Sequence, residues 1–158
     1  MRVVSVTSCR VAPPDSGRTI KTLHTAYRVG HLERSLDFYR TIGFSELGRV
    51  PVPDAVTLVC LKLPDDTATT LELVDEPAAR PIEIGNGLSH IVVQVEELTS
   101  TVDRLSAAGI ECGPIAHPGP STSWLRDPDG YRIELVEWPQ GHADGITAAD
   151  FESPSESE

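Results

Sequence analysis

The chain has 158 residues, enough for one ordinary domain or for two small modules of about 60 residues that share a surface. Its formal net charge is −11, and the stretch 139–158 holds five acidic residues and no Lys or Arg. This balance argues against a nucleic-acid-binding face, and no apolar run approaches the roughly 20 residues that a membrane span needs.

The cysteines give no sign of a disulfide framework. Cys9, Cys60 and Cys112 are odd in number, widely spaced and without a CxxC pair, which also argues against a thiolate metal site. The first 18 residues contain no uninterrupted apolar core of the signal-peptide kind. We therefore expect a reduced, cytoplasmic protein that binds neither nucleic acid nor membrane.

Residues 1–18 mix apolar and polar residues and are expected to be an N-terminal extension. Residues 19–76 are expected to form a first β-α-β-β-β module. Its first strand, at residues 21–29, alternates so that one face carries His24, Ala26 and Arg28. Apolar residues then recur at helical spacing up to Gly43, a residue typical of a helix C-cap. Three more strands are expected at residues 44–50, 55–63 and 69–74.

In the last of these strands Glu72 lies between Leu71 and Leu73, so it faces away from both. Residues 77–87 are rich in Pro, Gly and Asn and are a linker by composition.

A second module is expected over residues 88–138. It begins with a strand at 89–95 and a helix that ends at Gly109, and a Pro- and Gly-rich loop at 112–121 follows. A hairpin around the DPDG turn then joins the strands 123–126 and 131–137, and the second of these carries Glu134. Beyond it, the acidic and Ser-rich residues 139–158 have no periodicity and are expected to be disordered.

The two modules repeat one another. A shift of 66 positions pairs His24 with His90, and a shift of 62 pairs Glu72 with Glu134. Each of these residues alone could be structural, a hydrogen-bonded His or a Glu on a solvent face. Together, two imidazoles and two carboxylates on strands related by pseudosymmetry suit a divalent ion of the Zn or Ni type.

Four segments of the chain resemble glyoxalase I, the lactoylglutathione lyase family of the vicinal oxygen chelate superfamily. These segments read LHTAYRVGHLERSLDFY, TLELVDEP, GLSHIVVQV and DPDGYRIELVEW. The resemblance implies an α+β fold of two βαβββ modules, paired into a half-barrel around a metal site. It implies four metal ligands, which match His24, Glu72, His90 and Glu134.

The resemblance also implies a homodimer, in which the His24 and Glu72 half of one chain faces the His90 and Glu134 half of another. A monomer with both halves clasped internally stays open. Of the metals, we expect Ni²⁺, with Zn²⁺ or Co²⁺ as alternatives. The reaction implied is isomerisation of a hemithioacetal, formed from methylglyoxal and a low-molecular-weight thiol, to an S-lactoyl thioester. Glu134 matches the base, and Glu72 is the second candidate.

Three further residues concern the substrate. Arg28 matches an Arg that binds a carboxylate of glutathione in the family, although a plain ion pair is the alternative. Glu76 stands where the family often has Asn, a departure that leaves glutathione and mycothiol both open as the thiol. Trp124 matches an aromatic near the methyl end of the substrate, with a core aromatic as the alternative.

Two other functional classes stay open. One is another metalloenzyme of the superfamily, an epimerase or an antibiotic-modifying thiol transferase. The other is a small-molecule binding protein of the same fold. Epimerases of the superfamily typically carry Gln where this chain has Glu72, and binding proteins usually lack the ligands, so the full set of four favours the glyoxalase.

Overall fold

The computed structural model describes residues 20–117 and 120–137, and all structural statements concern these residues. The expected extension at 1–18 and the expected acidic tail at 139–158 lie outside them.

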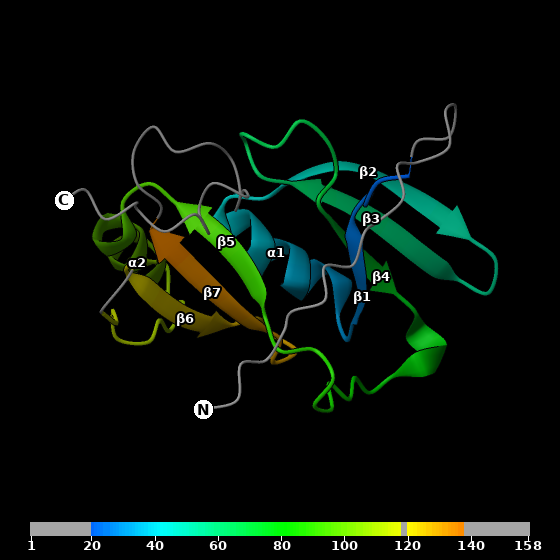
Figure 1. Cartoon of the computed structure of the whole chain (residues 1–158). Coiled ribbons are helices and arrows are strands. Elements are labelled where there is room, and N and C mark those ends of the chain that lie inside the picture. Colours follow the sequence, from blue (N-terminus) through cyan, green and yellow to red (C-terminus); the bar gives the residue numbers. More distant parts are fainter. Residues whose placement is uncertain (1–19, 118–119, 138–158) are drawn as a thin grey trace, which may run out of the picture.

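Figure 1 shows two sheets side by side, with α1 between them and α2 at the outer side of the second sheet. The elements of the first module are β1 (Thr25–Val29), α1 (Leu32–Ile42), β2 (Ser45–Val52), β3 (Val56–Lys62) and β4 (Leu71–Asp75). A short 3-10 helix, η1 (Pro77–Ala79), follows, and the second module contains β5 (Ile91–Val95), α2 (Leu98–Ala107), β6 (Thr122–Arg126) and β7 (Arg132–Glu137).

The first sheet has the strand order β1-β4-β3-β2. Its first and last strands along the chain, β1 and β4, run parallel, while β4, β3 and β2 are joined antiparallel. α1 connects β1 to β2. Its C-cap residue is Gly43, which has a positive φ of 133°, in agreement with the helix C-cap predicted from the sequence. The β-α-β-β-β order expected for the first module is therefore present.

Over the described residues, the second sheet repeats this plan with one strand fewer. Its order is β5-β7-β6, and β5 pairs parallel with β7. In place of a fourth strand, the segment before β6 makes isolated contacts with it: Gly113 N–H donates to the carbonyl of Trp124 at 2.7 Å, and Ala116 forms a single bridge with Thr122. The α+β class of two related modules is confirmed, and the sheets are not closed. A Pro- and Gly-rich sequence explains the missing strand, because Pro cannot donate to a ladder.

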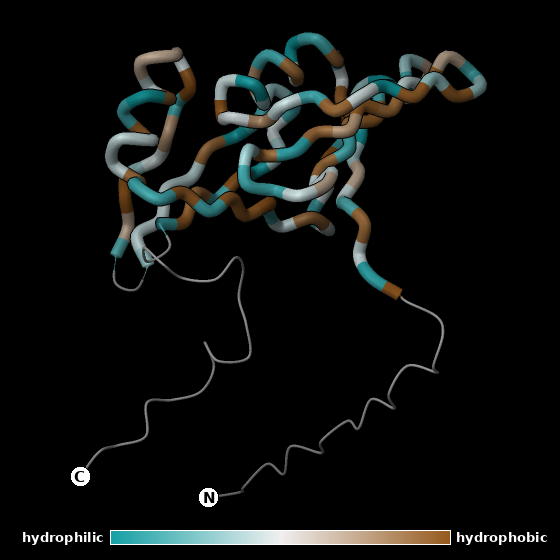
Figure 2. Tube along the Cα trace, turned by 90° about the horizontal axis from the view of Figure 1, so that it is seen from above, coloured by the Kyte–Doolittle hydropathy of each residue, from teal (hydrophilic) through white to brown (hydrophobic). Residues whose placement is uncertain are grey.

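The core lies on the faces that the alternation of the strands predicted. Tyr27 and Val29 of β1 are buried while their neighbours are exposed, and Leu71 and Leu73 of β4 are buried on either side of Glu72. Brown and teal segments alternate along both helices in Figure 2, as expected for helices with one apolar face. None of the helices in the described residues is long and apolar enough to cross a membrane.

The two modules meet where the turn between β6 and β7 contacts the loop between β1 and α1. Asp127 in this turn is only 5% exposed and accepts a hydrogen bond of 3.0 Å from Tyr39 O–H of α1. Burial raises the pKa of the Asp127 carboxyl, against the opposing effect of hydrogen bonds from the Tyr131 amide, the Tyr39 hydroxyl and the Asp129 amide. Asp129 accepts a hydrogen bond of 2.9 Å from Gly30 N–H.

The close approach of Asp129 requires a glycine at position 30. A Cβ there would lie 2.7 Å from Asp129 Oδ1. We expect Gly30→Ala to push the carboxylate away and to lower the free energy of unfolding by about 1–3 kcal/mol, the usual cost of overpacking. Gly48→Ala is the control, because a Cβ at Gly48 has no atom within 4 Å. Denaturant unfolding of both variants measures the difference, and equal stability of the two would contradict the steric argument.

Candidate metal and substrate site

His24 and Glu72 lie together on the outer face of the first sheet. His24 directly precedes β1, and Ala26 pairs with Glu72 in the parallel register of β1 and β4. Since side chains alternate along a strand, His24 and Glu72 point to the same face. His24 Nε2 lies 3.5 Å from Glu72 Oε2, and the two side chains are 23% and 14% exposed. Both side chains are therefore largely packed but still reach the surface.

His90 and Glu134 repeat this arrangement in the second sheet. His90 directly precedes β5, and Val92 pairs with Glu134 in the parallel register of β5 and β7. His90 Nε2 lies 3.4 Å from Glu134 Oε2, with side-chain exposures of 29% and 19%. The repeat seen in the sequence is thus a repeat in space, with one imidazole nitrogen and one carboxylate oxygen in each half. We call these pairs the first half-site and the second half-site.

The two half-sites differ in what surrounds them. In the second half-site Trp124 pairs with Glu134 across the hairpin, and its ring meets the ring of His90 edge-on, with centroids 5.0 Å apart. Arg132 places its guanidinium carbon 4.3 Å from the Trp124 ring centre. Ser89 Oγ lies 2.8 Å from His90 Nδ1, which leaves Nε2 as the nitrogen that faces Glu134.

In the first half-site the residue equivalent to Trp124 is Cys60, which pairs with Glu72 across β3 and β4. Its S–H donates to Glu72 Oε2 at 3.9 Å. The sequence interpretation had not singled out Cys60, Ser89 or Arg132. The sequence held a signal that each could lie near the site. Ser89 directly precedes His90, Arg132 lies two residues before Glu134 on the same face of its strand, and Cys60 points away from its buried neighbours in β3.

Arg28 and Glu76 pair with one another. Arg28 Nη1 lies 3.7 Å from Glu76 Oε2, and the same nitrogen donates to the carbonyl of Ala79 at 3.3 Å. Both side chains are well exposed, at 45% and 39%, so this contact is a weak surface pair. Arg28 follows His24 on the same face of β1 and therefore belongs to the first half-site. Trp124, by contrast, belongs to the second.

The half-sites do not meet within one copy of the chain. Over residues 20–117 and 120–137, no three His, Cys, Asp or Glu side chains gather closely enough to hold a metal ion. Each half-site lies at a sheet edge, since β1 and β5 are the outermost of the described strands in their sheets. Large apolar residues are exposed nearby, among them Leu23 and Val92 at 69% and 57%. Among the described residues the four predicted ligands therefore lie in two separate pairs, and the choice between a clasped monomer and a homodimer stays a prediction.

Each half-site still fits a divalent metal by its chemistry. A neutral imidazole nitrogen and a carboxylate oxygen, side by side and open to the outside, are ordinary ligands of Zn²⁺ and of neighbouring transition metals. Two such halves carry two negative charges, which balance a divalent ion. One half alone offers too few ligands for the closed coordination shell of such an ion. The four ligands expected from the sequence thus stay a prediction that requires both halves.

Residues 21–135 match the family model of the Glyoxalase/Bleomycin resistance protein/Dioxygenase superfamily. The lactoylglutathione lyase of Neisseria meningitidis serogroup A is 35% identical over 129 residues, covering 77% of this chain and 94% of the relative. The probable lactoylglutathione lyase of Vibrio cholerae is 34% identical over 130 residues, covering 78% of this chain and 94% of the relative.

Two solved structures have the same fold. The trypanothione-dependent glyoxalase I of Leishmania major superposes with a TM-score of 0.66 at 32% identity, covering 75% of this chain and 87% of that one. Glyoxalase I from Zea mays also gives 0.66, at 27% identity, and the match covers 75% of this chain and 44% of that one. These relatives confirm the expectation of a lyase similar to lactoylglutathione lyase. The chain belongs to the Glyoxalase/Bleomycin resistance protein/Dioxygenase superfamily and, within it, resembles glyoxalase I.

Proposed function

We propose that the protein is a metal-dependent glyoxalase I. It isomerises the hemithioacetal of methylglyoxal and a low-molecular-weight thiol to an S-lactoyl thioester, in the cytoplasm, where such thiol adducts form. The observation that carries the proposal is the duplicated pair of His and Glu, at 3.5 Å and 3.4 Å, at equivalent places in two sheets. The names of the relatives support the same reaction.

The working unit in this proposal is a homodimer with two equal sites. The first half-site of one copy faces the second half-site of the other, and the two-fold axis repeats the arrangement. Three observations support it: the half-sites do not meet within one copy, both lie at sheet edges, and Leu23 and Val92 beside them are exposed. Burial of exposed apolar side chains and pairing of open strand edges are the usual sources of stability for such an association.

In the assembled site His24, Glu72, His90 and Glu134 would hold the metal. We expect Ni²⁺, with Zn²⁺ or Co²⁺ as alternatives. A bound divalent ion supplies Lewis-acid stabilisation of the negative charge that develops on the substrate oxygens. The imidazoles of His24 and His90 orient the set, and Ser89 fixes which nitrogen of His90 faces inward.

The proton is moved by a carboxylate of this chain. Glu134 takes it from the carbon that bears sulfur and returns it to the neighbouring carbon, which was the carbonyl carbon of the methyl ketone. One C–H bond breaks and one C–H bond forms; the hydroxyl on the sulfur-bearing carbon loses its proton as it becomes the thioester carbonyl, and the former ketone oxygen gains one, so the reaction requires no external oxidant or reductant. Glu72 stands opposite in the assembled site and is the second candidate for the base.

The thiol is recognised at Arg28, and Trp124 packs against the methyl end of the substrate. Trp124 already lies against His90, which supports its place near the reacting atoms. Arg28 is partnered by Glu76, so a carboxylate of glutathione would compete with an acid that the chain itself provides. This competition keeps mycothiol, which lacks glutathione's pair of carboxylates, as the alternative thiol.

The base assignment predicts the effect of one amide substitution. Stripped protein is assayed for thioester formation with and without Ni²⁺, and turnover is expected only with the metal. Glu134→Gln is expected to lower kcat by about 10²–10⁴-fold, the usual contribution of a general base. Glu97→Gln, an exposed acid of the same module whose side chain makes no cap hydrogen bond, is the control. Full turnover in Glu134→Gln would transfer the role to Glu72.

The pairing of Arg28 and Glu76 predicts a change of thiol preference. Glu76→Gln frees the guanidinium, so kcat/KM with the glutathione adduct is expected to rise about two- to fivefold, the value of a weak surface ion pair. The mycothiol adduct serves as the internal control, because it lacks the pair of carboxylates that the freed Arg28 would bind. Steady-state kinetics with both adducts measure the ratio, and an unchanged ratio would remove Glu76 from thiol recognition.

A further inference from the structure

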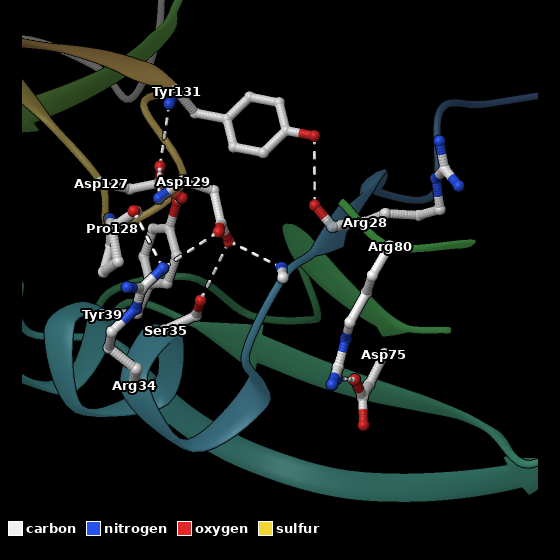
Figure 3. Close-up of polar contacts among 11 residues, drawn as sticks. Arg28, Arg34, Ser35, Tyr39, Asp75, Arg80, Asp127, Pro128, Asp129 and Tyr131 are labelled. Carbon is white, nitrogen blue, oxygen red and sulfur yellow. Dashed lines mark hydrogen bonds and ion pairs between the residues drawn. The ribbon is translucent and has the colours of Figure 1, made fainter. Parts of the chain in front are cut away.

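The turn between β6 and β7 makes contacts that neither the metal ligands nor the substrate residues account for. We call residues 127–131, with the sequence DPDGY, the DPDGY turn. It belongs to the second module, but its side chains reach into the first module at the end of β1 (Figure 3). The contacts are made at Arg28 and just after it. Arg28 is the residue to which the proposed function assigns thiol recognition.

The first contact is with Arg28 itself, near the end of β1. Tyr131 O–H donates to the backbone carbonyl of Arg28 at 3.1 Å. The Tyr131 ring packs against the ring of Tyr27, with centroids 4.4 Å apart. In Figure 3 the Tyr131 side chain spans the gap between the modules, while the guanidinium of Arg28 points away from the turn. The hydroxyl therefore holds the backbone of Arg28 and leaves its guanidinium exposed.

A second contact is made just after Arg28. Asp129 Oδ2 accepts hydrogen bonds from Gly30 N–H at 2.9 Å and from Ser35 Oγ at 3.4 Å. From the outer side Arg34 Nη2 binds Asp129 Oδ1 at 3.2 Å and the Pro128 carbonyl at 3.0 Å. The Asp129 side chain is only 6% exposed, so these bonds are well shielded from water. Residues 28 and 30 of the first module are thus both tied to the second module.

Hydrogen bonds to Asp127 fix the conformation of the DPDGY turn. Asp127 Oδ1 accepts from the backbone amides of Asp129 at 2.9 Å and Tyr131 at 2.8 Å. Tyr39 O–H binds the other oxygen of Asp127, and Gly130 supplies the positive φ of 96° that the turn requires. β1, in contrast, pairs with β4 alone among the described strands, so its outer edge has no ladder to support it. The turn provides that support.

We infer that Tyr131 and Asp129 are positioning residues, which hold the end of β1 so that the Arg28 guanidinium stands at a fixed place beside the first half-site. The inference rests on the proposed function, since it gives a reason for the placement of Arg28. It adds a consequence: the second module of a chain sets the thiol-binding geometry of the first module of the same chain. A loss of either contact then weakens substrate binding without disturbing the metal ligands.

The test compares hydroxyl deletions inside and outside the turn. Tyr131→Phe removes the bond to Arg28 and is expected to raise KM for the hemithioacetal about three- to tenfold, as one hydrogen bond allows, with kcat and metal content unchanged. Ser123→Ala is the control, because it removes a buried hydroxyl of the same module that binds the carbonyl of Gly113 and not the DPDGY turn. It is expected to lower stability and to leave KM as in the wild type.

Asp129 is tested by loss and rescue. Asp129→Ala is expected to raise KM in the same way and to speed amide hydrogen exchange at Gly30. Asp129→Asn, which keeps one oxygen for the Gly30 amide, is expected to restore both towards the wild type. The exchange rate at Gly30 requires no turnover, so the contact can be measured even in an inactive protein. Wild-type exchange at Gly30 in Asp129→Ala would overturn the inference.

Arg28→Ala separates failure of this inference from failure of the proposed function. If Arg28→Ala raises KM but Tyr131→Phe and Asp129→Ala do not, the positioning role is wrong and the proposed function stands. An equal rise in Tyr131→Phe and Ser123→Ala would show general loosening and also overturn the positioning role. If Arg28→Ala leaves KM unchanged, the proposed thiol contact fails, and the positioning role fails with it.

Discussion

Parallel pairing between the first and last strands of each module is the constraint on which the site depends. In the first sheet it sets Ala26 against Glu72, and in the second it sets Val92 against Glu134. Because parallel neighbours in register point to the same face, the His before each first strand comes beside the Glu of each last strand. A slip of one residue in either ladder would turn the Glu into the core, where Leu71 and Leu73, or Ile133 and Leu135, now lie.

The duplication of this ladder explains why the candidate site is distributed. Each module can bring together only one imidazole and one carboxylate, which is half of a metal coordination set. The modules differ at the neighbouring position, with Cys60 in one and Trp124 in the other, so the site of the proposed dimer would have a small polarisable side chain on one side and a large aromatic one on the other. In the proposed reaction this asymmetry would favour one substrate orientation, since the two ends of the hemithioacetal differ in size.

Much of this could be predicted from the sequence, for a physical reason. The alternation around Glu72 and Glu134, the helix end at Gly43 and the equivalence of His24 and His90 are local patterns with periods of strand and helix. Contacts between modules were not predicted. Tyr131 with Arg28 and Asp129 with Gly30 join residues about a hundred positions apart, and no periodicity marks such pairs. The second sheet was predicted in part: its residues indicated a Pro- and Gly-rich loop at 112–121, whereas the resemblance implied a fourth strand, which the described part of that sheet lacks.

The measurement that tests the central claim most directly is complementation between two inactive variants. One variant, His24→Ala with Glu72→Gln, lacks the first half-site, and the other, His90→Ala with Glu134→Gln, lacks the second. Each is expected to bind no metal tightly and to show no turnover. A mixed dimer, isolated with two different tags, contains one complete site and one empty of ligands, so about half of the wild-type metal content and activity should return. A mixed dimer as inactive as its parents, beside an active wild type, would contradict a site built from two copies of the chain.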